Sequence, residues 1–398
     1  MKTSHKILTA STALATIMGG GLLLSNNTYA TTVGLTQADF TFTNAACTSH
    51  EANAKGISCY DVSGDHYYQI SAGDYQLDEN IDFGTGVAFT AGESFSLDLN
   101  GKTLSGSNTT VIELDSTNNT ISGSGAITNP VSGVSFTARG VYTGGNLTSR
   151  NNLTVTGGTF GSVGMYGVNA TITGGTYTGS GWSMAAEFSE TNAVINGGTF
   201  SAPAASAAYF NQGADSTLEI NGGSFTSEAD NGIEFMEGVK NLKITAGTFT
   251  GKVSGLAFDV APTAATLSGG PFVATGTGEY DYGGSVLYGA DDISVLSGLL
   301  ASGASYSDPS AERGGTDPNF FVYLKNKRVT ISNGSRVFPE AAEEDTEETT
   351  SGSSAKSPNA GFTSAEANAA TSVIATAIAA TALTAAGLGI KKSLKKEA

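Results

Sequence analysis

Two glutamates, Glu187 and Glu234, are the residues of this chain whose type and spacing come closest to catalytic chemistry. Each is the third residue of a four-residue segment, Ala185–Phe188 or Gly232–Phe235. In both segments a small residue is followed by an apolar residue, the glutamate and a phenylalanine. If such segments stack as turns of a coil, carboxylates two turns apart lie roughly 10 Å apart. Inverting glycosidases hold their two carboxyl groups about 6.5–9.5 Å apart, so the pair is a candidate for glycan hydrolysis. The alternative is a solvated sheet face whose carboxylates are spread to avoid like-charge contacts.

The same stacking would place further polar and aromatic side chains on this outer face, where they could bind a sugar. Trp182 is the only tryptophan and is expected in a loop between two strands of one coil. It would serve either as a platform for a ligand or as a cover for the edge of the core. The candidates for ligand binding are Trp182, Glu187, Tyr209, Asn211, Glu234 and Asp259.

Other arrangements that carry chemistry are missing from the repeated part of the sequence. His50 and His66 precede the repeats, so no Ser/His/Asp or Cys/His set can be assembled there. The same two histidines lack the further ligands of a zinc site. We therefore expect no metal site and no cofactor.

The charge balance excludes one class of partner. The chain has 36 Asp plus Glu against 19 Lys plus Arg, a formal net charge of −17. A nucleic-acid-binding protein needs a basic face to displace counterions, and this chain has none. A polyanionic polysaccharide is disfavoured for the same reason.

The body of the chain is built from an internal repeat. The segment Leu153–Phe160 (LTVTGGTF) recurs five times, at Ala170–Tyr177, Ala193–Phe200, Leu218–Phe225, Leu242–Phe249 and Ala265–Phe272. The first residue of the Gly-Gly (or Ala-Gly) step falls at 157, 174, 197, 222, 246 and 269, which gives steps of 17, 23, 25, 24 and 23 residues. Repeats of this length indicate a stacked solenoid.

Each repeat reads as a strand followed by a bend. Apolar and polar residues alternate first, as in a half-buried strand. Gly-Gly then allows positive φ at little cost, and an aromatic residue should turn back into the interior. The small-apolar-x-Phe segment supplies a second strand in each repeat. The expected core columns are Leu153, Ile172, Ile195, Ile220, Ile244 and Leu267, and Phe160, Tyr177, Phe200, Phe225, Phe249 and Phe272.

With these repeats, the chain resembles the right-handed parallel β-helix of the pectin-lyase-like proteins. The resemblance covers residues 65–337 and implies an all-β solenoid with coils of about 23 residues. Upstream, Ser96–Leu104 (SLDLNGKTL) is similar to an early coil of surface β-helices. The runner-up fold is an array of β-sandwiches, which the regular period disfavours.

The fold alone does not decide between enzyme and binding protein, because it hosts lyases, hydrolases and adhesins. Pectate lyases use clustered Asp residues for calcium and an Arg or Lys base, yet no Arg occurs between Leu153 and Phe272. The dense Asp motifs and the Gly-His-Gly of polygalacturonases are also missing. The resemblance therefore implies the fold without the family's catalytic residues.

The N-terminal part reads as an export signal followed by a cap. Residues 1–30 combine an early positive charge, an apolar run and small residues before a cleavage point after Ala30. Residues 31–64 then form a cap region that contains Cys47 and Cys59. In an exported chain such a pair is expected to form a disulfide, the alternative being two free thiols.

The C-terminal part reads as a membrane anchor. Residues 338–366 are an acidic, then Ser/Gly-rich spacer. Residues 367–390 carry no charge and are long enough for a transmembrane helix, and the basic residues 391–398 should stay in the cytoplasm. Before the span, Ser357-Pro358-Asn359-Ala360-Gly361 resembles the Leu-Pro-x-Thr-Gly signal of sortase-anchored wall proteins. Pro358 and Gly361 match that pattern, whereas Ser357 replaces Leu and Ala360 replaces Thr.

These features predict an exported protein of the bacterial cell surface, held to the membrane or wall by its C-terminus. We expect a non-enzymatic adhesin or wall component that binds an extracellular glycan or a surface protein, with sortase as a further partner. A glycoside hydrolase is the rival function, and a self-associating coat subunit is a third. A cleft between two facing carboxylates would separate the first two.

Overall fold

The computed structural model describes most of residues 32–275 and short stretches of backbone beyond them. The described residues are 32–42, 47, 50–62, 65–181, 183–211, 215–237, 239–258 and 262–275, followed by 285–288, 302, 304–306, 311–313, 322–324 and 328–333. The predicted signal peptide, spacer, transmembrane helix and basic tail lie outside them, as do Trp182, Asp259, Pro358, Asn359, Ala360 and Gly361. None of the helices within the described ranges is long and apolar enough to span a bilayer.

Three long sheets, here called A, B and C, account for nearly all described strands. Sheet A contains, in spatial order, β1 (Val33–Leu35), β4 (Gly73–Leu77), β7 (Ser94–Asp98), β10 (Asn118–Ser122), β15 (Asn151–Val155), β18 (Val168–Ile172), β21 (Asn192–Ile195), β24 (Thr217–Ile220), β27 (Asn241–Ile244) and β30 (Ala264–Leu267). Sheet B contains β2 (Ile57–Val62), β3 (Asp65–Ile70), β6 (Val87–Thr90), β9 (Ile112–Leu114), β12 (Val134–Arg139), β17 (Ser162–Tyr166), β20 (Ala186–Ser189), β23 (Ala208–Asn211), β26 (Ile233–Phe235), β29 (Ser254–Phe258), β32 (Ser285–Tyr288), β35 (Val322–Leu324) and β34 (Ala311–Arg313). Sheet C contains β33 (Ala304–Tyr306), β36 (Arg328–Asn333), β31 (Gly270–Ala274), β28 (Thr248–Gly251), β25 (Ser224–Ser227), β22 (Thr199–Ala202), β19 (Thr176–Thr178), β16 (Thr159–Phe160), β11 (Gly125–Thr128), β8 (Lys102–Ser105) and β5 (Ile81–Asp82).

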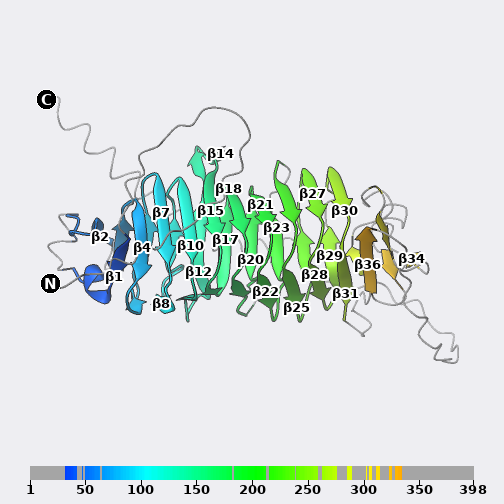
Figure 1. Ribbon diagram of the computed structural model, residues 1–398, viewed down its shortest axis with the longest axis horizontal. Coiled ribbons are helices and arrows are strands. Elements are labelled where there is room, and N and C mark those ends of the chain that lie inside the picture. Colours follow the sequence, from blue (N-terminus) through cyan, green and yellow to red (C-terminus); the bar gives the residue numbers. More distant parts are fainter. Residues whose placement is uncertain are drawn as a thin grey trace, which may run out of the picture. The chain divides into compact units, whose positions relative to one another are not determined.

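The chain visits the three sheets in turn and so winds into a parallel β-solenoid of about nine turns (Figure 1). From β18 in sheet A it passes to β19 in sheet C, then to β20 in sheet B, and returns to sheet A at β21. The register is parallel, with Ile172 beside Ile195 on the next coil. The parallel β-helix predicted from the repeats is therefore confirmed.

From β4 onward, each described coil contains three strands, whereas the sequence pattern predicted two. The missed strand holds the aromatic residue of the repeat, as in β19 and β22 of sheet C. It follows the Gly-Gly bend and is only two to four residues long in the repeats from β16 to β28. An alternation this short gives no periodic signal that distinguishes a strand from a turn.

The Gly-Gly bend has the backbone conformation that the sequence predicted. The second glycine of the step has positive φ in each described repeat, for example +108° at Gly198 and +102° at Gly223. This conformation is strained for residues with a Cβ atom. The bend thus fixes where sheet A ends and sheet C begins.

In the core, side chains at equivalent positions of successive coils stack in columns. The aromatic column of sheet C is almost parallel, with ring centroids 4.5 Å apart for Tyr177 and Phe200 and 4.7 Å apart for Phe200 and Phe225. All the predicted core residues of both columns are buried. Leu153 is offset from its column by two residues, as the alignment of the repeats allowed: Val155 pairs with Ile172, and Leu153 stacks on Ala170.

The two ends of the described solenoid are built differently. At the C-terminal end, β31 pairs antiparallel with β36, so the parallel order of sheet C stops there (Figure 1). At the N-terminal end, Cys47 and Cys59 form a disulfide with an S–S distance of 2.07 Å, and both residues are fully buried. A short 3-10 helix, η1 (Gln37–Phe40), covers this end.

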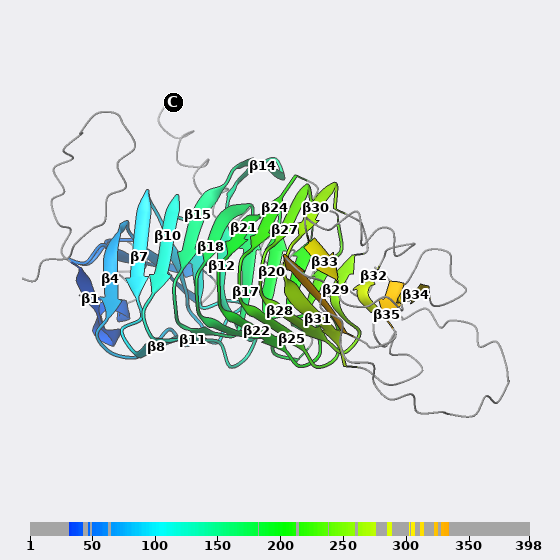
Figure 2. The same cartoon turned by 45° about the vertical axis from the view of Figure 1, so that its right-hand side comes forward.

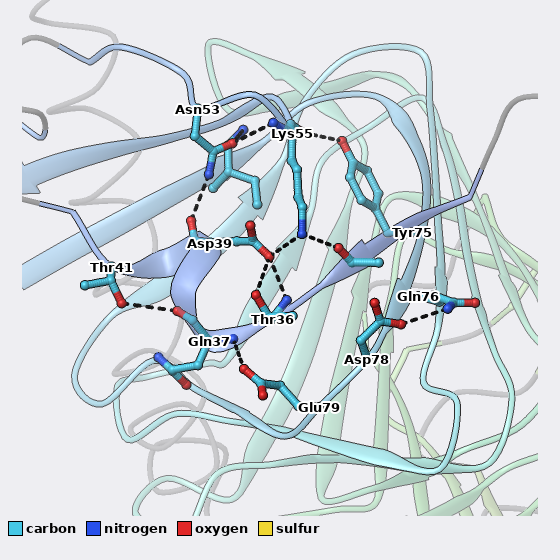
Figure 3. Close-up of polar contacts among 12 residues, drawn as sticks. Thr36, Gln37, Asp39, Thr41, Asn53, Lys55, Tyr75, Gln76, Asp78 and Glu79 are labelled. Atoms are coloured by element: carbon cyan, nitrogen blue, oxygen red, sulfur yellow. Dashed lines mark hydrogen bonds and ion pairs between the residues drawn. The ribbon is translucent and has the colours of Figure 1, made fainter.

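A lysine–aspartate contact ties the N-terminal cap together (Figure 3). Lys55 Nζ donates to Asp39 Oδ2 at 2.7 Å and to the carbonyl oxygen of Gly34 at 2.5 Å. The backbone N–H of Thr36 donates to the same carboxylate at 2.7 Å. Lys55 and Asp39 together thus join β1, η1 and the segment before β2.

We expect Asp39→Asn to destabilise the cap in a pH-dependent way. Burial acts to raise the pKa of Asp39, but the hydrogen bonds from Lys55 and Thr36 outweigh it and lower the pKa below the usual 3.8. A lowered folded-state pKa means that the carboxylate stabilises the fold above about pH 4 and loses this effect as the pH falls through the folded value. Because Lys55 is partly exposed, we expect a loss of only about 1 kcal/mol at pH 7.

Thermal unfolding of wild type and Asp39→Asn at pH 7, 5 and 3 measures this difference. The exposed Glu93→Gln serves as a charge control. A difference between wild type and Asp39→Asn that stays constant down to pH 3 would contradict the assignment.

Candidate functional site

Three of the predicted site residues, Glu187, Tyr209 and Glu234, stand in one column on sheet B. The register places Glu187 beside Tyr209 and Tyr209 beside Glu234 on consecutive coils. Their chain neighbours Phe188 and Phe210 stack in the core, so alternation along the strands turns the column outward. The two glutamates therefore lie two coils apart, with Tyr209 on the coil between them.

Two residues of this column are less exposed than in the solvated face that was the alternative interpretation of the sequence. Glu187 and Tyr209 are each only 6% exposed. The burial of Glu187 depends in part on Gly164, which pairs with it on the preceding coil. A Cβ atom at Gly164 would lie 2.5 Å from the ring of Tyr166, so that ring covers the glycine. From there the Tyr166 hydroxyl donates to Glu187 Oε2 at 3.0 Å.

An arginine on the preceding coil extends this network. Arg139 pairs with Tyr166 in the register, and its guanidinium lies 3.3 Å from Glu113 Oε1. The side chains of Arg139 and Glu113 keep 17% and 22% of their exposure, so the network reaches solvent at this end. We call Glu113, Arg139, Tyr166 and Glu187 the sheet B cluster. Their strands, β9, β12, β17 and β20, are consecutive in sheet B, and the last three are labelled in Figure 1.

The cluster contains a buried donor and a buried acceptor without partners. Among the residues that the structure describes, neither Arg139 Nε nor Glu187 Oε1 makes a hydrogen bond. Each such atom costs about 1–3 kcal/mol relative to a satisfied one. Folded proteins keep few of them, and each needs a structural or functional reason.

Burial also controls the ionisation of the cluster. It raises the pKa of Glu187, and the hydrogen bond from Tyr166 only partly opposes this shift. Burial, and then the nearby Glu187 carboxylate, raise the pKa of Tyr166 well above its usual value. Tyr166 is therefore a neutral donor at physiological pH, and Glu187 holds a proton more readily than an exposed glutamate does.

Glu234 belongs to a second polar group, on the later coils. The Ser206 hydroxyl lies 2.5 Å from Glu234 Oε2 and 3.0 Å from Asp230 Oδ2. The Asn231 amide donates to Asp230 Oδ1 at 2.9 Å. Burial raises the pKa of Asp230, opposed by the hydrogen bonds that it accepts. Because one hydroxyl has one proton, Ser206 cannot donate to both carboxylates, and a proton shared by the pair would satisfy the second contact.

Of the other predicted residues outside the Glu187 column, the structure describes Asn211. It is half-buried at the end of β23, in the column next to Tyr209. Sequence reasoning missed Arg139 and Glu113 because their coils precede the clear repeats, and it missed Tyr166 because its strand has Met165 in place of the phenylalanine. Phe188 pairs with Met165 on the preceding coil, and Met165 pairs with Ala138 on the coil before that. Following this column upstream would have shown that the next residues, Tyr166 and Arg139, also align.

One group of potential metal ligands occurs in the described residues. Cys47, Cys59 and His66 bring their ligand atoms within 4.8 Å of one another. Both sulfur atoms are joined in the disulfide, and zinc requires thiolate sulfur. This group therefore does not fit a metal ion while the disulfide is intact.

Comparison with known proteins adds no relative. The chain matches no protein family, no curated protein and no solved structure.

Proposed function

We propose that this protein is an exported surface protein whose solenoid binds an extracellular glycan at the sheet B cluster without cleaving it. The export signal and the C-terminal anchor predicted from the sequence would place the solenoid outside a bacterial cell. Sortase would be a partner if the motif around Pro358 and Gly361 is processed. The acidic spacer would hold the binding domain away from the surface.

The observation that supports this proposal is the solvent end of the cluster, where the side chains of Arg139 and Glu113 are partly exposed. A sugar hydroxyl can donate to the Glu113 carboxylate and accept from the Arg139 guanidinium. Hydrogen bonds to charged groups are about twice as strong as those between neutral groups, which favours a glycan bound there. Parallel strands hold the cluster rigidly, which limits the entropy lost on binding.

A glycan array with the purified full-length chain tests the proposal, scored for both retention and product release. We expect retention of neutral glycans and no shortened products. Binding to no glycan would contradict the proposal, and release of shortened products would replace it with the enzymatic alternative.

A glycoside hydrolase is the second candidate, and the Asp230–Glu234 pair favours it. Two carboxyl groups at one hydroxyl, one with a raised pKa, resemble the acid and base of general acid–base catalysis. The pair Glu187 and Glu234 suits this role less, because Tyr209 lies on the coil between them. Glu234→Gln should abolish product release if the pair is catalytic and leave retention unchanged if it is structural.

A further inference from the structure

A polar groove lies beside the only described hairpin that leaves the three sheets. The hairpin consists of β13 (Val141–Thr143) and β14 (Asn146–Ser149), inserted where the chain passes from sheet B to sheet A (Figure 2). The groove has a volume of about 930 Å³, and β14 forms one of its walls. Small-molecule sites usually measure about 300–1,000 Å³, so the groove has room for a short oligosaccharide.

The hairpin is held in place by contacts at its base. The Tyr142 hydroxyl donates to Glu190 Oε2 at 2.9 Å, and Arg150 Nε donates to the carbonyl oxygen of Glu190 at 3.0 Å. Leu147 packs over Gly167, where an added Cβ atom would lie 2.5 Å from Leu147 Cδ1. The wall formed by β14 is therefore anchored to the solenoid.

Asparagines on neighbouring strands of sheet A also line the groove and are fixed by their own contacts. Asn192 Nδ2 donates to Asn169 Oδ1 at 3.0 Å, and Asn169 Nδ2 donates to Asn152 Oδ1 at 3.2 Å. Thr217 continues the row by donating to Asn192 Oδ1. Side chains positioned before binding lose little entropy when a ligand arrives.

The charge of the groove lining indicates which class of ligand it can bind. The lining contains one cation, Arg150, and three carboxylates, Glu190, Asp215 and Glu237, so its formal net charge is −2. Such a groove repels uronic acids and sulfated sugars. Amide, hydroxyl and carboxylate groups together suit the hydroxyls of a neutral sugar, which both donate and accept.

Tyr142 connects this groove to the sheet B cluster. Its hydroxyl, bonded to Glu190 in the groove wall, would lie 2.7 Å from a Cβ atom on Gly167. Gly167 directly follows Tyr166 of the cluster. Arg139, at the solvent end of the cluster, stands three residues before Tyr142 in the chain. The groove and the cluster therefore meet near the turn from sheet B to sheet A.

We propose that the groove is a second subsite for a neutral oligosaccharide that starts at the sheet B cluster and crosses Tyr142. The inference rests on the proposed function, because the cluster supplies the first subsite. It adds the ligand class, a neutral glycan chain, and a requirement for length. Short chains fill the cluster alone, whereas longer chains also fill the groove.

The test is a titration of the full-length chain with a series of neutral oligosaccharides of increasing length, chosen from those that the array retains. Ser149→Trp places a large ring in the groove, and Asp215→Asn/Glu237→Gln removes two of its carboxylates. Glu219→Gln is the matched control, since its carboxylate is exposed and pairs with Lys243 at 2.8 Å outside the groove lining. Thermal unfolding checks that each variant is folded.

We expect wild type and Glu219→Gln to bind long chains at least tenfold more tightly than short ones. Both groove variants should lose this gain and keep the affinity for short chains, and the double variant should also bind uronic-acid oligomers better than wild type does. If chain length brings no gain, or the groove variants retain it, the groove inference fails while binding at the cluster stands. Binding of no oligosaccharide would refute the proposed function itself.

Discussion

Replacing Phe225 with alanine is expected to lower the free energy of unfolding by about 3–5 kcal/mol. Phe225 is fully buried, and its ring stacks at 4.7 Å on Phe200 and at 5.3 Å on Phe249. The substitution leaves a cavity that interrupts the aromatic column in its middle. Because each coil contacts only its neighbours, the stability lost here is not recovered elsewhere in the solenoid.

Chemical denaturation followed by circular dichroism measures this effect. Val131→Ala is the control, since Val131 is 74% exposed and its truncation should change stability by less than about 0.5 kcal/mol. A loss under about 1 kcal/mol for Phe225→Ala would mean that the column does not stabilise the stack.

The second large effect is expected at the sheet B cluster, where Glu187→Gln should stabilise the protein at neutral pH. Burial raises the pKa of Glu187, so the folded state holds its proton to higher pH than the unfolded state does. The wild type therefore loses stability as the pH rises from the unfolded pKa, near 4.5, through the folded pKa. Glutamine remains neutral throughout and accepts the same bond from Tyr166.

The melting temperatures of wild type and Glu187→Gln should be close at pH 4 and diverge towards pH 8, with the variant more stable. Glu219→Gln should not gain stability over wild type with rising pH, because the hydrogen bonds from Lys243 and Asn221 lower the pKa of Glu219 instead of raising it. The difference in melting temperature between Glu187→Gln and wild type should rise from pH 4 to pH 8. A difference that falls over this range would contradict the assignment. A stabilising substitution at this position would indicate that the carboxylate is retained for a purpose other than folding.

The sequence predicted the solenoid because its information is local and repeated. The alternation around Ile172 and Ile195, the Gly-Gly bend and the following aromatic residue each report the conformation of a few neighbouring residues. Repetition then fixes the register, since equivalent residues must stack to bury their faces. The third strand was missed because β16, with two residues, is too short to show a period.

The hairpin also carried a local signal that the sequence reasoning did not use. Gly144-Gly145 stands between two short strands, and both glycines have positive φ, +59° and +82°. Two such residues between strands are typical of a two-residue hairpin turn.

The candidate site was harder to predict, because its geometry depends on several coils at once. Glu187 and Glu234 were placed in the right column, yet the burial of Glu187 depends on the Tyr166 ring one coil away. Arg139 joins from a further coil, before the repeats become regular. Contacts between side chains of different coils follow from rotamers and packing, which a repeat pattern does not specify.

The central claim is that the sheet B cluster binds a glycan hydroxyl at its solvent end, where Glu113 and Arg139 are partly exposed. Titration calorimetry of the full-length wild type, Glu113→Gln and Glu219→Gln with the shortest neutral oligosaccharide retained on the array tests it most directly. Glutamine keeps the size of Glu113 but replaces the carboxylate with an amide, which is a weaker acceptor. We predict at least a tenfold weaker affinity for Glu113→Gln and an unchanged affinity for Glu219→Gln. Equal affinity in all three proteins would contradict the claim.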